Sequence, residues 1–202
     1  MRGPPLELKD NTSVVKIFIN YRTADEPYGA ALLDGALSQC FGTDVVFRAP
    51  KSIGPGDDFE QQIMAAAGST RVLLAVIGPK WLAAADDNGN RRLDDPNDFV
   101  RREIATAFAH GVRVIPVLMN STRISAAKLP PDISALAKCQ DVRVHFRSSH
   151  TDLPILVQRL QLLVPELNRI PDVTDRAVTI NAMIVKGVFR EKVYVAGDFI
   201  IT

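Results

Sequence analysis

Residues 95–108 have the sequence DPNDFVRREIATAF, and they predict the helix on which the rest of the fold depends. Four apolar side chains recur at helical spacing: Val100, Ile104, Ala107 and Phe108. This spacing places them on one stripe, which we expect to face a core. Asp95 followed by Pro96 is typical of an N-cap with proline at the first helical position. We therefore predict that the helix begins there.

Glu103 is the one acidic residue in the body of this helix, and we place it at the margin of the apolar stripe, roughly 80° from its centre. A carboxylate at that position should be partly desolvated and still within reach of a ligand. Such a group either has a chemical role or forms an ordinary ion pair with a surface arginine. The helical spacing leaves both interpretations open.

The helix lies between apolar runs that predict buried strands. RVLLAVI at 71–77 precedes it and VRVIPVL at 112–118 follows it, and a continuous apolar run is typical of a strand covered on both faces. The complete expected set is strands at 14–19, 45–47, 71–77, 112–118 and 142–146, with helices at 28–40, 59–67, 95–108, 133–137 and 153–163. Strands alternating with helices predict an α/β fold, a flavodoxin-like five-stranded parallel sheet with helices on both faces.

Composition limits the classes of protein that the chain can belong to. The 202 residues are 47% hydrophobic and 23% charged, as in a soluble globular domain with a small appendage. A net charge of +1 gives no basic surface for nucleic acid, and no run of 18 apolar residues predicts a membrane span. Cys40 and Cys139 form no CxxC motif, and residues 1–13 do not resemble a signal peptide. We therefore expect a cytoplasmic protein.

Several common sites are not predicted. The chain has no Walker or GxGxxG loop and no GxSxG elbow. Its three histidines, His110, His145 and His150, lack the spacing of metal ligands, so we predict no metal site. The expected ligand position is instead the rim beyond the carboxyl ends of the strands, where Arg22, the loop at 50–58, Trp81 and Glu103 should converge.

Five short motifs, in this order along the chain, resemble those of a Toll/interleukin-1 receptor (TIR) domain of the bacterial type. They are IFINYR at 17–22, IGPGDDF at 53–59, VIGPKWL at 76–82, DFVRREI at 98–104 and IPV at 115–117 followed by LP at 129–130. The resemblance covers about residues 14 to 165 and implies the TIR version of the flavodoxin-like fold.

The resemblance also implies a function. Some TIR domains are NAD⁺ glycohydrolases or cyclases, with NAD⁺ as the substrate and no other cofactor, and Glu103 matches their essential glutamate. The implied substrate-binding residues are Tyr21, Arg22, Ile53, Gly56, Trp81 and Phe99. Trp81 and Phe99 would wall the nicotinamide end, although packing in the core is the alternative for both. Other TIR domains are non-catalytic adaptors that bind one another, and this alternative stays open.

One position departs from the family pattern. The family often has an aspartate at the end of the second strand, where this chain has Ala49 after Arg48. Asp57 or Asp58 are the candidates to replace that carboxylate.

The C-terminal segment has a different pattern. We divide the chain into a disordered segment at 1–13, a TIR domain at 14–167 and a β-strand extension at 168–202, because the pattern changes to alternating apolar residues from Val173 onward. This tail either docks on its own domain or pairs with a second chain in a homo-oligomer.

Overall fold

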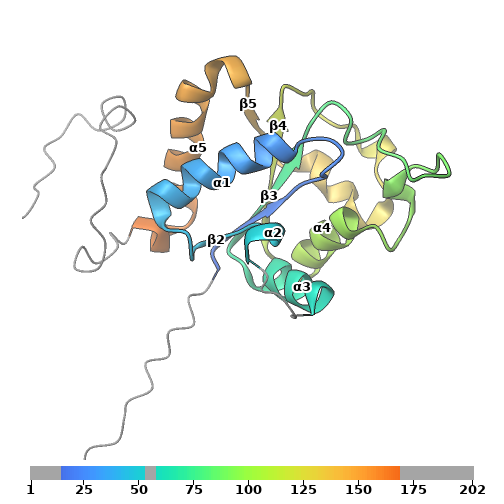
Figure 1. The fold of residues 1–202 in the computed structure, drawn as a ribbon, viewed down its shortest axis with the longest axis horizontal. Coiled ribbons are helices and arrows are strands. Elements are labelled where there is room, and N and C mark those ends of the chain that lie inside the picture. The colour runs from blue at the N-terminus through green and yellow to red at the C-terminus, as the bar shows by residue number, and fades with distance from the viewer. Residues whose placement is uncertain (1–14, 53–57, 169–202) are drawn as a thin grey trace, which may run out of the picture.

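The computed structural model describes residues 15–52 and 58–168 (Figure 1). Five parallel strands form one sheet in the order β2-β1-β3-β4-β5. The strands are β1 (Ile17–Asn20), β2 (Val46–Phe47), β3 (Val72–Ile77), β4 (Arg113–Met119) and β5 (Val142–Val144). The prediction of a five-stranded parallel sheet is confirmed.

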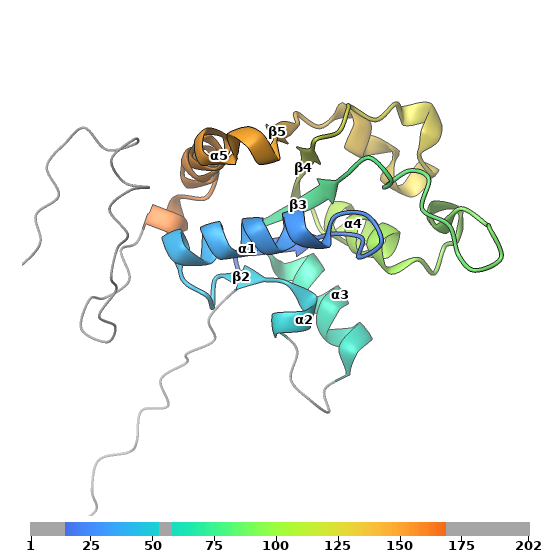
Figure 2. The ribbon, with the colours of Figure 1, turned by 45° about the horizontal axis from the view of Figure 1, so that its top comes forward.

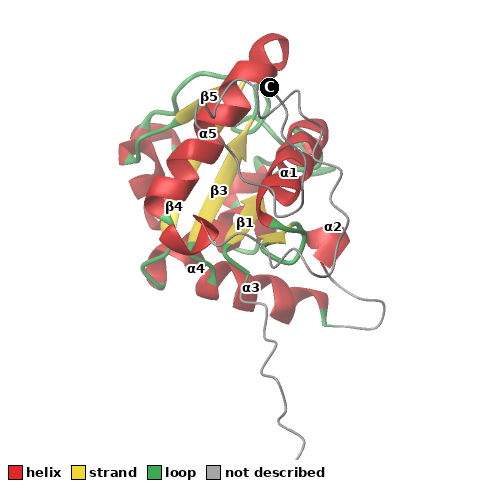
Figure 3. Ribbon diagram, turned by 90° about the vertical axis from the view of Figure 1, so that its left-hand side faces the viewer, coloured by secondary structure: helices red, strands yellow, loops and turns green. Residues whose placement is uncertain are grey.

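Helices cover both faces of the sheet (Figures 2 and 3). The α-helices are α1 (Pro27–Phe41), α2 (Ala49–Ser52), α3 (Phe59–Ser69), α4 (Phe99–Ala109) and α5 (Ser149–Leu163). The 3₁₀ helices are η1 (Arg92–Asp94), η2 (Ala126–Lys128), η3 (Pro131–Lys138), η4 (Phe146–Ser148) and η5 (Pro165–Asn168). Buried side chains of α1 and α5 share one apolar cluster, and those of α3, α4 and η3 share the other.

The central strand β3 shows why the apolar runs do not alternate with polar residues. All six of its residues are buried. Successive side chains of a strand point to opposite faces, so Val72, Leu74 and Val76 join the α1–α5 cluster. Leu73, Ala75 and Ile77 join the α3–α4 cluster.

The strand order reverses beside β1. The chain passes from β1 to β2 on one side, and β3 then pairs with β1 on the other side. Asn20, the last residue of β1, lies beside Ala75 of β3 at this point. In open α/β sheets the carboxyl ends of the strands at such a switch point are the usual place for a ligand.

The predicted start of the helix at Asp95 is wrong, because α4 begins at Phe99 and is capped by Asp98. The Asp95 side chain instead accepts a hydrogen bond from the Asn97 backbone N–H at 2.8 Å and closes a turn. The Asp98 carboxylate accepts from the Arg101 N–H at 3.0 Å, which is the N-cap contact.

Other boundaries also differ from the prediction. Residues 49–52 form the short helix α2, which overlaps the start of the loop predicted at 50–58. The last helix begins at Ser149, four residues before the predicted start, and the Asp152 carboxylate accepts bonds from the His145 N–H and the Ser148 hydroxyl beside its first turn. The helix predicted at 133–137 is the 3₁₀ helix η3.

Two predicted segments fall outside the described residues: the disordered N-terminus at 1–13 and, apart from Asn168, the β extension at 168–202. Within the part of the chain that the structure describes, no helix is long and apolar enough to span a membrane.

Candidate functional site at the end of β1

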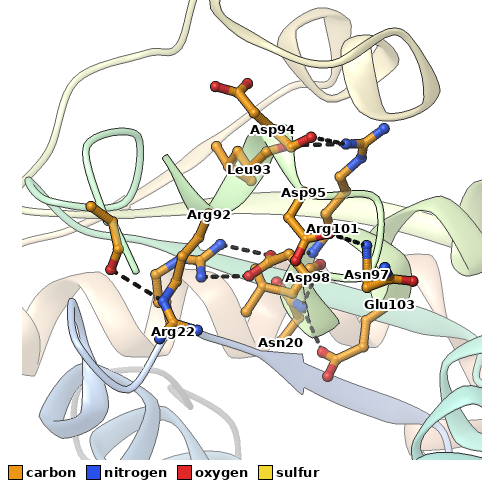
Figure 4. Close-up of polar contacts among 12 residues, drawn as sticks. Asn20, Arg22, Arg92, Leu93, Asp94, Asp95, Asn97, Asp98, Arg101 and Glu103 are labelled. Atoms are coloured by element: carbon orange, nitrogen blue, oxygen red, sulfur yellow. Dashed lines mark hydrogen bonds and ion pairs between the residues drawn. The ribbon is translucent and has the colours of Figure 1, made fainter. Parts of the chain in front are cut away.

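The end of β1 meets the first turns of α4 through one amide (Figure 4). The Asn20 Nδ2 group donates to Glu103 Oε2 at 2.6 Å and to the Val100 carbonyl oxygen at 3.2 Å. Asn20 is fully buried and Glu103 is 7% exposed. Glu103 therefore lies deeper than the helical spacing predicted. Asn20, which holds its carboxyl group, was not among the predicted site residues.

Burial is the main influence on the protonation of Glu103. It raises the pKa of the carboxyl group to about 8, and the negative charge of Asp98 acts in the same direction. The hydrogen bond from Asn20 and the charge of Arg22 lower this pKa, but they do not offset the burial. In this conformation the neutral acid is therefore the main form of Glu103 at pH 7.

A buried ion pair lies beside this contact. The Arg22 guanidinium donates to both carboxylate oxygens of Asp98, each at 2.8 Å, and both side chains are 5% exposed. Because Asp98 also caps α4, the pair fixes the helix N-terminus against the segment that follows β1. Arg22 thus contacts Asp98 and not Glu103.

Period-two alternation along β1 decides which predicted residues come together. Phe18 belongs to the α3–α4 cluster, and Asn20 and Arg22 continue on that face. Ile19 belongs to the α1–α5 cluster, and the half-buried Tyr21 packs against the same cluster. Tyr21 therefore lies on the other face of the sheet from Glu103.

An aromatic pair lies at the N-termini of α3 and α4. The rings of Phe59 and Phe99 meet edge to face at 6.0 Å, and the Arg102 guanidinium lies 5.7 Å from the centre of the Phe99 ring. Arg102 also pairs with Glu60 at 2.6 Å. Phe99 is 40% exposed, so its ring is available to a ligand.

Trp81 differs from Phe99, because it is fully buried and belongs to the α3–α4 cluster. Its indole Nε1 has no hydrogen-bond partner within the described residues. The structure thus places Trp81 in the core, the alternative to its predicted place in the wall of the site.

The remaining predicted positions either lie outside the described residues or make other contacts. Ile53 and Gly56 lie outside the described residues. Ala49 begins α2 and packs against the α3–α4 cluster. The Asp58 carboxylate caps α3 by accepting from the Gln61 N–H at 3.0 Å, so it already has a structural use, and Asp57 is outside the described residues.

One cavity lies away from Glu103. A cavity of about 410 Å³ lies between β5 and α5, and its lining includes Arg143 and Arg159 but not Glu103. No group of three or more potential metal-ligating side chains occurs among residues 15–52 and 58–168.

Comparison with known proteins assigns the chain to a family. Residues 17–155 match the TIR domain family, and the chain belongs to it. Among solved structures, the chain is similar to the TIR domains in the activated Roq1 resistosome directly recognising the pathogen effector XopQ. That likeness has 12% sequence identity and a TM-score of 0.42, and covers 86% of this chain and 96% of the other. A search of curated proteins gives no match.

Proposed function

We propose that this TIR domain is an NAD⁺ glycohydrolase that cleaves the bond between nicotinamide and ribose. The observation that supports it best is the Glu103 carboxyl group, nearly buried at the switch point of the sheet and held there by Asn20. A solvated surface glutamate paired with an arginine would be the mark of an ordinary structural role, and Glu103 makes no ion pair with any described residue.

A single carboxylate is sufficient for this chemistry. When the bond between ribose C1′ and the pyridinium nitrogen breaks, the electron pair goes to nitrogen and nicotinamide leaves as a neutral molecule. No general acid is needed, in contrast to ordinary glycosidases. The ribosyl group becomes an oxocarbenium-like cation, which the Glu103 carboxylate stabilises. Water then adds to C1′ and loses a proton, which gives ADP-ribose.

The raised pKa of Glu103 sets a condition on the reaction, because only the anion stabilises a cation. The pyridinium ring of NAD⁺ carries a positive charge, which favours the ionised carboxylate when it lies nearby. Substrate binding and ionisation of Glu103 should therefore support each other. The half-exposed ring of Phe99 offers an apolar surface at the same end of α4.

The family also suggests the setting of this activity. We propose that the domain works in bacterial defence or signalling, in the cytoplasm, and that self-association raises its activity. The basis is membership of the TIR family.

A non-catalytic adaptor is the second candidate function. It is favoured by one observation, namely that Trp81, which was expected to wall the nicotinamide end, is fully buried in the described conformation. In an adaptor, Glu103 would be a neutral core residue whose amide contact only joins α4 to β1.

The deciding experiment measures nicotinamide release from NAD⁺ by concentrated protein, with chromatography to separate ADP-ribose from a cyclic product. Glu103→Gln keeps the size of the side chain and removes its charge, so it should abolish release. Glu166→Gln is the matched control, because Glu166 lies beside the amino ends of β1 and β3, where it pairs with Arg71. Equal release by all three proteins would remove Glu103 from the reaction. No release by the wild type at any concentration would favour the adaptor.

A further inference from the structure

The Asn20 amide has an orientation that its neighbours fix. Its Nδ2 group lies within hydrogen-bond distance of both the Val100 carbonyl oxygen and Glu103 Oε2. A backbone carbonyl can only accept, so the side of the amide that faces Val100 must be the N–H₂ group. The same group is therefore the donor to Glu103.

The two acceptors are three residues apart on α4, which places them on the same side of the helix. Asn20 itself is held in β1, beside Ala75 in the register of the sheet. The amide thus connects a rigid strand to a fixed point on the helix and to the carboxyl group that follows it. This arrangement fixes one oxygen of Glu103 and leaves Oε1 without a hydrogen bond to any described residue (Figure 4).

This arrangement is costly for a purely structural contact. Asn20 Oδ1 is buried and has no hydrogen-bond partner among the described residues. A buried acceptor without a partner destabilises a fold, and an apolar side chain at the same position would avoid that cost. The preceding residues on this face and its partner strand are apolar, as Phe18 and Leu73 show. The presence of an amide here is explained if it serves Glu103.

We propose that Asn20 is a positioning residue, which holds Glu103 Oε2 against β1 so that Oε1 is the oxygen presented to the reacting ribosyl carbon. The proposal rests on the proposed function. Asn20 does not touch the substrate in this scheme and acts through Glu103.

The test compares Asn20→Asp, which has the same shape but no N–H donor, with Asn20→Ser, which keeps a donor on a shorter side chain. Asn88→Asp in an exposed turn is the matched control for the first change. Loss of positioning should lower kcat for nicotinamide release by about 10- to 100-fold in Asn20→Asp, with a much smaller change in KM. The serine variant should recover part of that loss.

A second measurement does not depend on activity. The ¹³C NMR signal of the Glu103 carboxyl carbon, assigned with Glu103→Gln, is followed against pH. The Asn20 hydrogen bond lowers the pKa of Glu103, and a neighbouring carboxylate raises it. Asn20→Asp should therefore move the titration to higher pH, and Asn88→Asp should leave it unchanged.

The outcomes separate the two proposals. A wild type without nicotinamide release refutes the proposed function, and the NMR titration still decides whether Asn20 holds the Glu103 carboxyl group. An unchanged titration in Asn20→Asp and Asn20→Ser, or full kcat in both, would overturn the role of Asn20. Near-ultraviolet circular dichroism establishes whether each variant is folded. If Asn20→Asp does not fold, the test is made with Asn20→Ser alone.

Discussion

Arg22 and Asp98 form a two-point ion pair in which each guanidinium-to-carboxylate distance is 2.8 Å and each side chain is 5% exposed. The residues are 76 positions apart in the sequence. The pair connects the segment after β1 to the N-cap of α4 and so fixes the helix that carries Glu103.

Breaking one side of this pair should destabilise the protein strongly. Arg22→Met leaves the Asp98 carboxylate buried without its partner, so the free energy of unfolding should fall by about 3–5 kcal/mol. Asp98→Asn keeps an oxygen for the helix cap. The double variant should therefore lose much less than the sum of the two single variants. Urea denaturation in a double-mutant cycle measures this difference, and simple additivity would contradict the pair as the cause.

Ionisation of Glu103 should make the folded state less stable as the pH rises. Its pKa is about 8 in the folded chain against 4.5 for an ordinary solvent-exposed glutamate, so between these values the native state holds a proton that the unfolded state has lost. The stabilisation is complete below about pH 4.5 and is lost as the pH rises through about 8, by up to about 1.4 kcal/mol per pH unit.

Glu103→Gln removes this titration, so the stability of the variant relative to the wild type should increase between pH 5 and pH 8. Burial and Asp25 also raise the pKa of Glu26. Glu26 is present in both proteins, so its contribution to the pH dependence of stability cancels in the difference between them. Denaturation curves at a series of pH values give the result. A difference that does not change with pH would show that Glu103 is not buried as described.

Trp81 and Phe99 should respond differently to truncation. Trp81 is fully buried, so Trp81→Ala should lower the free energy of unfolding by about 3–5 kcal/mol. Phe99 is 40% exposed, and Phe99→Ala should cost only about 1 kcal/mol, chiefly the edge-to-face contact with Phe59. If Phe99 contacts NAD⁺, its variant should raise KM while the fold remains intact. Thermal and chemical unfolding, together with the nicotinamide assay, separate the two effects.

Self-association is testable with a chain that ends at residue 172. The alternating pattern beyond residue 173 predicts strands that a second chain can complete. If these strands join the copies, the activity of the full chain should rise steeply with concentration. The truncated protein should lose that rise and have a lower mass in solution. Light scattering at equal concentrations gives the mass, and circular dichroism confirms that the α/β domain is folded. An unchanged mass would assign the tail to its own domain.

The sequence by itself determined the parallel sheet and the order of its elements. The run at 72–77 is apolar on both faces, and that is sufficient to bury β3 between two layers of helices, because hydrophobic burial depends on the pattern and not on particular partners. The same logic placed Glu103 on α4 beside the apolar stripe. Family motifs added the TIR assignment, which the match over residues 17–155 confirms.

Only the tertiary structure decided how the site is built. The sequence pointed to Asp95 as the helix cap, and the position of Asp98 opposite Arg22, where it caps α4, is visible only in three dimensions. Helical spacing cannot show how deeply Glu103 and Trp81 are covered, because coverage comes from elements far away in the chain. For the same reason Asn20 could not be predicted: its partners lie 80 and 83 residues away, and a hydrogen bond of this kind depends on the packing of α4 against β1.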